Sequence, residues 1–437
     1  MPRRGGGGRV SDRERGRDGY ENAPVVRNRE TLRPSPCLAS LSPPGRVNAA
    51  SRLNRLPHWF AILRATMTSS TRADDTFLTS PAQTLAVPDG FRFEHGQVIA
   101  PFEIAFETYG ELNTDKSNAI LVCHALSASA HAAGKYSLAD EKAGWWDGLI
   151  GFEKAIDLNR HFVVCINFPG SCRGTTSPAS INSTTDKPHG SRYPWITIQD
   201  MVEAERLVLD HLGIGRLESV AGGSLGGMQV LMWAALYPER VESIITMAAA
   251  AAVPVQGVAW HIIGRKIVEG DLRFVGGDYY EQAGTLRGLQ LARMVGHMTY
   301  LSTEGLEKKF GRRRRGSTRQ FEIDSYLEYQ GKKFGSSFDA NSYIRIQAAM
   351  DEMDLTEQFG TLAGAFARFE GRALLVSFNT DWLFPPAEVV KVHEALTARH
   401  VDSEYHEIET MSGHDAFLID YDLISPPVAR FLDKKRS

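Results

Sequence analysis

The sequence predicts an α/β protein built on a mostly parallel, doubly wound β-sheet, and two observations lead to this fold class. Short, bulky and nearly continuous apolar runs recur along the chain, as expected of strands that are buried on both faces of a parallel sheet. Segments with helical periodicity separate these runs, and such alternation is typical of a doubly wound sheet. The predicted strands are Ala119–Cys123, Phe162–Asn167, Glu218–Ala221, Ser243–Met247 and Ala373–Phe378.

Two predicted helices between these strands have recognisable ends. The sequence Thr197-Ile198-Gln199-Asp200 has the form of a capping box, so we expect a helix to begin there and to end at Gly213. A second helix is expected to begin after Ser224 and to end before Pro238. The alternation of strands and helices therefore continues through the middle of the chain.

Composition divides the chain into three parts. Residues 1–75 are rich in Arg, Gly, Ser and Pro, so we expect a disordered N-terminal extension, or translation from a start upstream of a true first residue at Met67. Residues 76–252 and 368–437 carry the strand pattern and form the expected core. Residues 253–367 lose this pattern and are helix-like, as expected of a helical lid inserted late in the sheet.

Charge and cysteine usage exclude several classes of protein. A net charge of -3 over 437 residues gives no general reason to expect a nucleic-acid partner. No apolar run is long enough to span a bilayer, and the first residues lack the apolar region of a secretory signal. The 4 cysteines lack metal-binding spacing. We therefore expect reduced thiols in a cytoplasmic protein that binds no metal.

The strongest chemical signal is a serine placed between glycines. The predicted strand Glu218–Ala221 leads into Gly222-Gly223-Ser224-Leu225-Gly226, which matches G-x-S-x-G in its strand–turn–helix context. Glycines permit the sharp turn that lifts a serine hydroxyl clear of the sheet. The N–H of Leu225, at the start of the helix, would then point to the place where an oxyanion forms. Ser224 is therefore the predicted nucleophile.

A serine nucleophile needs a base and an acid that orients the base, and on an α/β-hydrolase fold these residues follow the serine in the order Asp or Glu, then His. Asp381 follows the predicted strand Ala373–Phe378, and His414 follows the next strand-like run. We therefore predict the α/β-hydrolase fold, with His414 as base and Asp381 as its orienting acid. Asp415 is the competing acid. The N–H of Leu126, in the loop after the predicted strand Ala119–Cys123, is expected to be the second oxyanion donor.

Several unusual strings occur between about Thr84 and the C-terminus. They are His124-Ala125-Leu126, Gly170-Ser171-Cys172-Arg173-Gly174, Gly222-Gly223-Ser224-Leu225-Gly226-Gly227-Met228, Ala292-Arg293-Met294, His297 to Tyr300, Phe338-Asp339-Ala340-Asn341 and Gly413-His414-Asp415-Ala416-Phe417. Together they resemble the homoserine O-acyltransferase family. The resemblance implies a catalytic triad and an acceptor site: the triad is Ser224, Asp381 and His414, and the residues that hold the amino-acid acceptor are Arg293, Tyr300 and Asp415.

The chemistry of homoserine agrees with this implication. An arginine such as Arg293 can bind a carboxylate through two hydrogen bonds. Asp415, next to His414, can hold the ammonium so that the hydroxyl faces the base. Tyr300 follows Arg293 by seven residues, about two helical turns, and so lies on the same helix face. The alternatives are a solvated helix arginine and a tyrosine that only packs.

The acyl donor is the remaining choice. Family members use acetyl- or succinyl-coenzyme A, and in succinyl-using members the second residue after the triad aspartate is often arginine. Leu383 stands there in this chain, which leaves a second carboxylate unpaired and favours acetyl. The alternative is that Leu383 merely packs. The basic run Arg312 to Arg315 could attract the phosphates of coenzyme A, although an exposed helix or loop is the simpler interpretation.

The sequence therefore predicts transfer of an acetyl group from acetyl-CoA to the hydroxyl of L-homoserine through an acyl-serine intermediate. The co-substrate acetyl-CoA is the only cofactor expected. The resemblance also implies methionine biosynthesis and a homodimer, with contacts through the helical insertion. Four alternatives stay open: a succinyl donor, a serine acceptor, a serine esterase on the same fold, and an inactive member of the family.

Overall fold

The computed structural model describes residues 72–73 and 76–434 of the chain. The predicted extension over residues 1–75 therefore lies outside the described residues, except for Arg72 and Ala73. These two residues form β1 (Arg72–Ala73), which pairs with β2 (Thr76–Phe77) in a small antiparallel sheet. Three further two-stranded sheets lie in connecting segments: β4 (Phe91–Arg92) with β5 (Val98–Ile99), β8 (Ile150–Gly151) with β9 (Ile156–Asp157), and β11 (Ile181–Asn182) with β12 (Lys187–Pro188).

An eight-stranded sheet carries the fold, in the order β16-β15-β14-β13-β7-β10-β6-β3. Six neighbouring strands from β16 to β10 are parallel, whereas β6 and β3 pair antiparallel at one edge. This arrangement confirms the predicted mostly parallel sheet. The strands are β3 (Gln83–Val87), β6 (Phe102–Tyr109), β7 (Ala119–Cys123), β10 (Phe162–Ile166), β13 (Ser219–Gly223), β14 (Ser243–Met247), β15 (Arg372–Phe378) and β16 (Asp402–Ile408).

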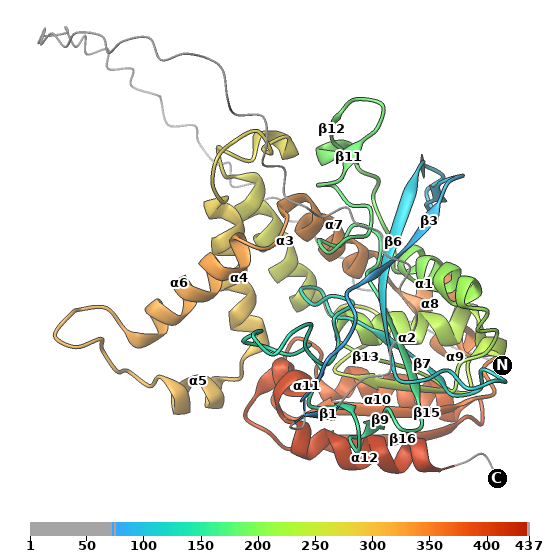
Figure 1. The fold of residues 1–437 in the computed structure, drawn as a ribbon. Helices are drawn as coiled ribbons and strands as arrows, with labels where there is room; N and C mark the ends of the chain where they lie inside the picture. Colours follow the sequence, from blue (N-terminus) through green and yellow to red (C-terminus); the bar gives the residue numbers. More distant parts are fainter. Residues whose placement is uncertain (1–71, 74–75, 435–437) are drawn as a thin grey trace, which may run out of the picture. The chain divides into compact units, whose positions relative to one another are not determined.

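The central strands are buried on both faces, which explains their continuous apolar sequences. Every residue of β7, β10, β13 and β14 is buried. Alternate residues of β7 enter two different hydrophobic clusters, because successive side chains of a strand point to opposite faces. The cluster that contains Leu121 includes residues of α1 (Ile198–Leu212), α2 (Leu225–Leu236) and α10 (Pro386–Thr397), whereas the cluster that contains Ile120 includes residues of α12 (Tyr421–Asp433). Helices therefore cover the two faces of the sheet (Figure 1).

The ends of α1 confirm the capping prediction. The Thr197 hydroxyl accepts a hydrogen bond from the N–H of Asp200, and the Asp200 carboxylate accepts one from the N–H of Thr197. Gly213 ends the helix in the left-handed conformation, with φ of 68°. The second predicted helix is α2, which ends at Leu236, two residues before Pro238.

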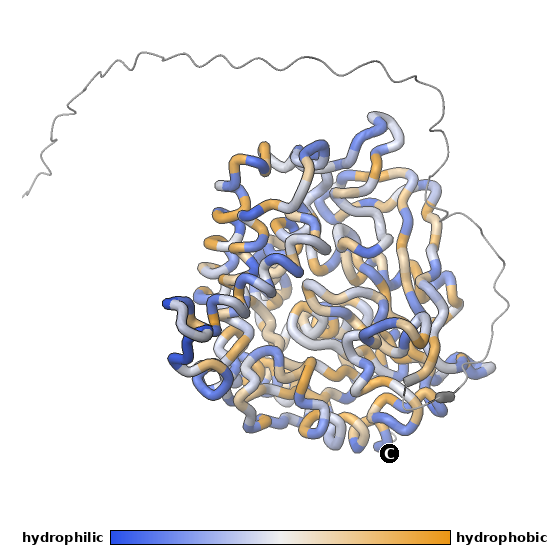
Figure 2. The backbone as a smooth tube through the Cα atoms, turned by 60° about the vertical axis from the view of Figure 1, so that its left-hand side comes forward, coloured by the Kyte–Doolittle hydropathy of each residue, from blue (hydrophilic) through white to orange (hydrophobic). Residues whose placement is uncertain are grey.

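A helical insertion, defined here as α3 to α9, separates β14 from β15. Its helices are α3 (Val255–Glu269), α4 (Arg287–Tyr300), α5 (Thr303–Lys309), α6 (Glu322–Gly335), α7 (Ala340–Glu352), α8 (Leu355–Phe359) and α9 (Leu362–Ala365). In Figure 1, α3, α4 and α6 lie together beside the sheet, and the loop between α5 and α6 extends outward. Hydrophilic residues gather at the tips of the outer loops (Figure 2). Within the described part of the chain, every helix is too short or too polar to cross a membrane.

Candidate active site

Ser224 lies at the sharp turn between β13 and α2. Its φ of 58° and ψ of -127° are unusual for a residue with a side chain, and such strain is typical of a nucleophile turn. The turn needs glycine at both flanks. A Cβ atom on Gly222 would lie 2.5 Å from the backbone of Gly226, and one on Gly226 would lie 2.1 Å from the carbonyl oxygen of Cys123. The motif therefore folds as the sequence predicts.

The structure brings Ser224, His414 and Asp381 into one hydrogen-bonded chain. His414 Nε2 lies 2.8 Å from Ser224 Oγ, and His414 Nδ1 lies 2.8 Å from Asp381 Oδ2. All three residues are buried. Because a carboxylate only accepts hydrogen bonds, Nδ1 carries the ring proton and Nε2 is free to accept the serine proton. This is the geometry of a serine nucleophile with its base and orienting acid.

Asp381 is held in place by the backbone that follows it. Its Oδ1 accepts hydrogen bonds from the N–H groups of Leu383, at 2.9 Å, and Phe384, at 3.0 Å. Its other oxygen is therefore directed at His414. Burial lowers the pKa of His414, but the charge of Asp381, its hydrogen bond and the charge of Asp415 outweigh burial, so the pKa is raised. The competing acid, Asp415, does not contact either ring nitrogen of His414.

The two predicted oxyanion donors lie on either side of the serine turn. Leu225 is the first residue of α2 and is fully buried, and Leu126 lies in the loop after β7. Within the described residues, neither N–H donates to a protein acceptor. An unpaired N–H in the first turn of a helix is available to a negatively charged oxygen.

Arg293 and Tyr300 lie on one face of α4, as their spacing predicts. The Arg293 guanidinium lies 5.0 Å from the centre of the Tyr300 ring and 4.7 Å from the centre of the Phe334 ring. The Tyr300 ring is in turn 6.3 Å from the ring of His414. The Tyr300 ring therefore lies between Arg293 and His414 in this chain of contacts.

Asp415 contributes a negative charge to the same place. Burial raises its pKa, while His414 and Arg293 act to lower it. Within the described part of the chain, neither Asp415 nor Arg293 forms a salt bridge. A cation and an anion without salt-bridge partners among the described residues therefore lie near His414, as a zwitterionic amino acid would require.

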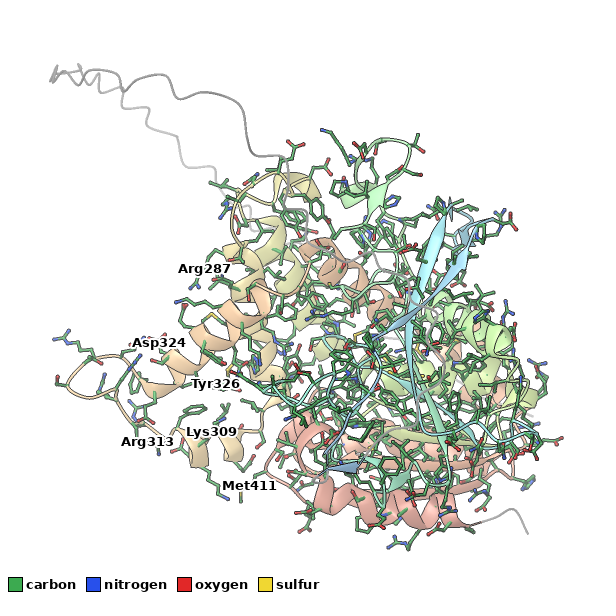
Figure 3. All side chains as sticks on the ribbon, in the orientation of Figure 1. Arg287, Lys309, Arg313, Asp324, Tyr326 and Met411 are labelled. Atoms are coloured by element: carbon green, nitrogen blue, oxygen red, sulfur yellow. The ribbon has the colours of Figure 1, made fainter. Side chains whose placement is uncertain are left out.

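Two residues of α6 join this cluster although no sequence motif indicated them. Phe334 stacks on Arg293, and the hydroxyl of Tyr326 lies 3.5 Å from His297 Nδ1. Burial, followed by the charge of Asp415, raises the pKa of Tyr326, so this hydroxyl is close to the acceptor residues. Figure 3 labels Tyr326 on α6. The spacing of residues along a helix does not predict which other helix packs against it, so the contact between α6 and α4 could not be predicted from the sequence.

Leu383 is buried and lies against the start of α3. A Cβ atom on Gly257 would be 3.3 Å from Leu383 Cδ1. An open cavity of about 400 Å³ lies beside the segment that precedes Leu383. The residues that line this cavity are Gln256, Thr303, Glu304, Asn379, Thr380, Asp381 and Trp382. No group of three or more potential metal ligands occurs among the described residues.

Two arginines of the basic run Arg312 to Arg315 contact side chains that lie close to them in the sequence. Arg313 forms a salt bridge with Glu322 at 2.9 Å, and the guanidinium of Arg314 lies 4.4 Å from the centre of the Phe321 ring. The run therefore fits the simpler interpretation, an exposed loop of the helical insertion.

Comparisons with known proteins assign the chain to a family. A family model for the alpha/beta hydrolase fold matches residues 118–421. The chain is 44% identical over 352 residues to a homoserine O-acetyltransferase of Deferribacter desulfuricans, covering 79% of this chain and 93% of the relative. It is also 44% identical over 351 residues to a homoserine O-succinyltransferase of Burkholderia multivorans, covering 77% and 92%.

Solved structures agree with the sequence comparisons. The crystal structure of homoserine O-acetyltransferase from Bacillus anthracis matches with a TM-score of 0.77 and 30% identity, over 82% of this chain and 99% of that one. The fold, the serine turn and the relatives lead to the same conclusion. The chain belongs to the homoserine O-acetyltransferase family of α/β-hydrolase-fold proteins.

Proposed function

We propose that the protein transfers an acetyl group from acetyl-CoA to the hydroxyl of L-homoserine, giving O-acetyl-L-homoserine. One observation carries this proposal: Arg293 and Asp415, a cation and an anion that form no salt bridge among the described residues, lie near the Ser224–His414–Asp381 chain. An ordinary esterase needs the serine, the base and the acid, but it has no use for a site that matches a zwitterion. The names of the relatives support the same acceptor.

The first half-reaction acylates the serine. His414 Nε2 takes the proton of Ser224 as Oγ attacks the thioester carbonyl, and the resulting oxyanion is held by the N–H groups of Leu225 and Leu126. The carbon–sulfur bond then breaks, and the departing thiolate takes the proton from His414. Coenzyme A leaves as the free thiol, and acetyl-serine remains.

The second half-reaction moves the acetyl group to the acceptor. Arg293 binds the homoserine carboxylate, with Tyr300 beside it, and Asp415 binds the ammonium, so that the hydroxyl points at His414. His414 takes the hydroxyl proton, and the homoserine oxygen attacks the acetyl ester through a second oxyanion. The bond between the acetyl carbon and Ser224 Oγ breaks, and Oγ recovers its proton from His414. Serine is one methylene shorter, so its hydroxyl would not reach the base from the same anchored position.

Acetyl rather than succinyl is proposed as the donor group on the character of Leu383. Relatives with both names are 44% identical to this chain, so overall identity does not choose between the donors. The side chain of Leu383 is apolar and buried next to Gly257, and it offers no partner to the second carboxylate of a succinyl group. An acetyl group requires no such partner.

The helical insertion serves in this proposal as a lid that excludes water, because water would hydrolyse the acetyl-enzyme. The insertion also supplies the surface proposed for a homodimer. Along α3, Val255, Ile262 and Ile263 are exposed, and Met298 is exposed on the adjacent α4. An apolar stripe of this kind is typical of a protein interface. Light scattering tests the dimer, and a monomer at micromolar concentration would contradict it.

We place this reaction in the cytoplasm and in methionine biosynthesis. Cys123, Cys165 and Cys172 are free thiols, which suits a reducing compartment. O-Acetylhomoserine carries a good leaving group on its γ-carbon, so the reaction that consumes it is expected to replace the acetate with a sulfur nucleophile.

Release of free coenzyme A from acetyl-CoA tests the function. Thiol should appear slowly without an acceptor and rapidly with L-homoserine, and Ser224→Ala should abolish both rates. Equal rates with and without homoserine would identify a hydrolase instead. No thiol release under either condition, with an intact fold, would identify an inactive family member. Parallel runs with succinyl-CoA and with L-serine determine the donor and the acceptor.

A further inference from the structure

Two hydrogen-bond donors hold the carbonyl group of Ala125, in the loop that carries the Leu126 N–H. The carbonyl oxygen of Ala125 accepts a hydrogen bond from His124 Nδ1, at 2.9 Å, and another from the N–H of Ala128, at 3.0 Å. Ala125 C=O and Leu126 N–H belong to one peptide unit, and in a trans peptide these groups point in opposite directions. Holding the carbonyl therefore fixes the direction of the N–H that is proposed to bind the oxyanion.

The His124 ring is suited to this task and to no other task visible in the structure. It is fully buried and stacks on Phe168, with ring centres 4.3 Å apart and planes at 19°. Burial lowers its pKa to about 4, so the ring is neutral. Because a carbonyl only accepts hydrogen bonds, the one ring proton lies on Nδ1. Nε2 is left buried without a partner in the described part of the chain, so Nδ1 makes the one hydrogen bond of this ring.

Gln229 joins this loop to the second proposed donor. It lies on α2, five residues after Ser224, and is fully buried. Its Nε2 donates to the carbonyl of His124 at 3.3 Å and to the carbonyl of Leu225 at 3.2 Å. One amide group therefore bridges the loop after β7 and the first turn of α2, the two segments that supply the oxyanion donors.

We propose that His124 and Gln229 are positioning residues of the oxyanion hole. His124 orients the peptide whose N–H comes from Leu126, and Gln229 ties together the peptides next to the two donors, through the carbonyl groups of His124 and Leu225. Neither side chain touches the reacting atoms. The proposal rests on the proposed acyl-transfer function, and it adds that both half-reactions depend on the two side chains equally, because an oxyanion forms in each.

Three substitutions separate the hydrogen bond from packing. His124→Phe keeps a ring that can stack on Phe168 but removes the donor. His124→Asn removes the ring but places an amide nitrogen near the position of Nδ1. Gln229→Met keeps the length of the side chain without its amide. As a control, His161→Phe removes another buried histidine, at the opposite end of β10 from the active site.

Removal of one oxyanion donor typically lowers kcat about 100- to 1000-fold, and loss of positioning should cost less. We expect His124→Phe and Gln229→Met to lower kcat roughly 10- to 100-fold with little change in KM for homoserine. The burst of p-nitrophenol from p-nitrophenyl acetate, which reports acylation of Ser224 alone, should slow by the same factor. His124→Asn should recover most of the rate, and His161→Phe should leave kcat unchanged.

A kcat for His124→Phe within twofold of wild type would overturn the proposal, and so would a His124→Asn enzyme no faster than His124→Phe. A fall in kcat for His161→Phe as large as that for His124→Phe would also do so, because general destabilisation would then explain both. The p-nitrophenyl acetate burst does not depend on acetyl-CoA or homoserine. If acetyl transfer to homoserine is absent but the burst responds as described, the proposed function fails and the positioning role stands.

Discussion

Replacing Arg293 by methionine should separate acceptor binding from formation of the acetyl-enzyme. The guanidinium lies between two rings, 5.0 Å from the centre of Tyr300 and 4.7 Å from that of Phe334. Methionine is similarly long and keeps an apolar contact with both rings, so the main loss is the charge and its donors. We expect R293M to form acetyl-enzyme from acetyl-CoA at the wild-type rate and to transfer the acetyl group to homoserine slowly.

The expected loss in kcat/KM for homoserine follows from the number of hydrogen bonds between Arg293 and the homoserine carboxylate, and from how exposed these bonds are to solvent. A hydrogen bond to a charged group contributes about 1.5 to 3 kcal/mol. Arg293 is only half-buried, so solvent screens part of this energy. A contact of two bonds with the homoserine carboxylate is therefore worth about 2 to 4 kcal/mol. That corresponds to a fall in kcat/KM for homoserine of roughly 30- to 700-fold.

Two acceptors that each lack one charged group of homoserine allow the assay to show which of these groups Arg293 binds. 3-Amino-1-propanol is homoserine without its carboxylate, and 4-hydroxybutanoate is homoserine without its ammonium. Coenzyme A release should show that R293M and wild type transfer equally to 3-amino-1-propanol, because the partner of Arg293 is absent from it. Asp415→Asn should show the converse, with equal transfer to 4-hydroxybutanoate. If R293M loses as much with 3-amino-1-propanol as with homoserine, carboxylate pairing is refuted and the variant has damaged the site in general.

Three further predictions concern charge and burial. Asp415→Asn removes a charge that raises the pKa of His414, so the acid limb of the p-nitrophenyl acetate burst should move to lower pH; an unmoved limb would contradict this. Leu383→Arg supplies a cation for a second carboxylate, and the ratio of kcat/KM for succinyl-CoA over acetyl-CoA should rise about tenfold or more, whereas Leu383→Met should leave it unchanged. Glu205, which accepts a hydrogen bond from the Trp233 indole at 2.6 Å, has its pKa raised by burial from 4.5 to about 8. The native state therefore keeps a proton that the unfolded chain releases, and stability falls by about 1.4 kcal/mol per pH unit between these two values. Glu205→Gln should remove this loss, so the Tm of the variant relative to wild type should increase from pH 5 to pH 8, and a constant difference would count against it.

The parts of the fold that the sequence predicted are those in which a local pattern has a single structural meaning. The short continuous apolar runs of β7, β10 and β14 are typical of strands buried on both faces, and the capping box at Thr197 marks one helix start. The two antiparallel strands at the sheet edge were not predicted. β6 contains Glu103 and Glu107 among its apolar residues, so it lacks a continuous run. Glu107 is nevertheless buried, because the hydroxyls of Tyr109 and Tyr136 donate hydrogen bonds to its carboxylate.

The residues of the candidate site also divide into those that a local sequence pattern predicts and those that it does not. Ser224, Asp381 and His414 follow strand ends, and parallel strands bring their carboxyl ends to one edge of the sheet, so order and position sufficed to predict them. Tyr326 and Phe334 depend on how α6 packs against α4, and no local pattern specifies the packing of two helices within an insertion. His124 and Gln229 are single polar residues in apolar surroundings. Their partners are backbone carbonyls, which leave no trace in a sequence.

The proposed role of Leu383 as the residue that selects the donor is compatible with an unchanged triad geometry. Its N–H donates to Asp381 Oδ1 at 2.9 Å, and this bond needs only the backbone. The side chain is therefore free to vary while the triad acid stays oriented. The segment that fixes Asp381 also carries Leu383, the residue expected to recognise the acyl group. Leu383 therefore lies a fixed distance along the backbone from Asp381. We therefore expect that a new side chain at this position can change the donor preference while the hydrogen bonds of His414 and Asp381 stay as they are.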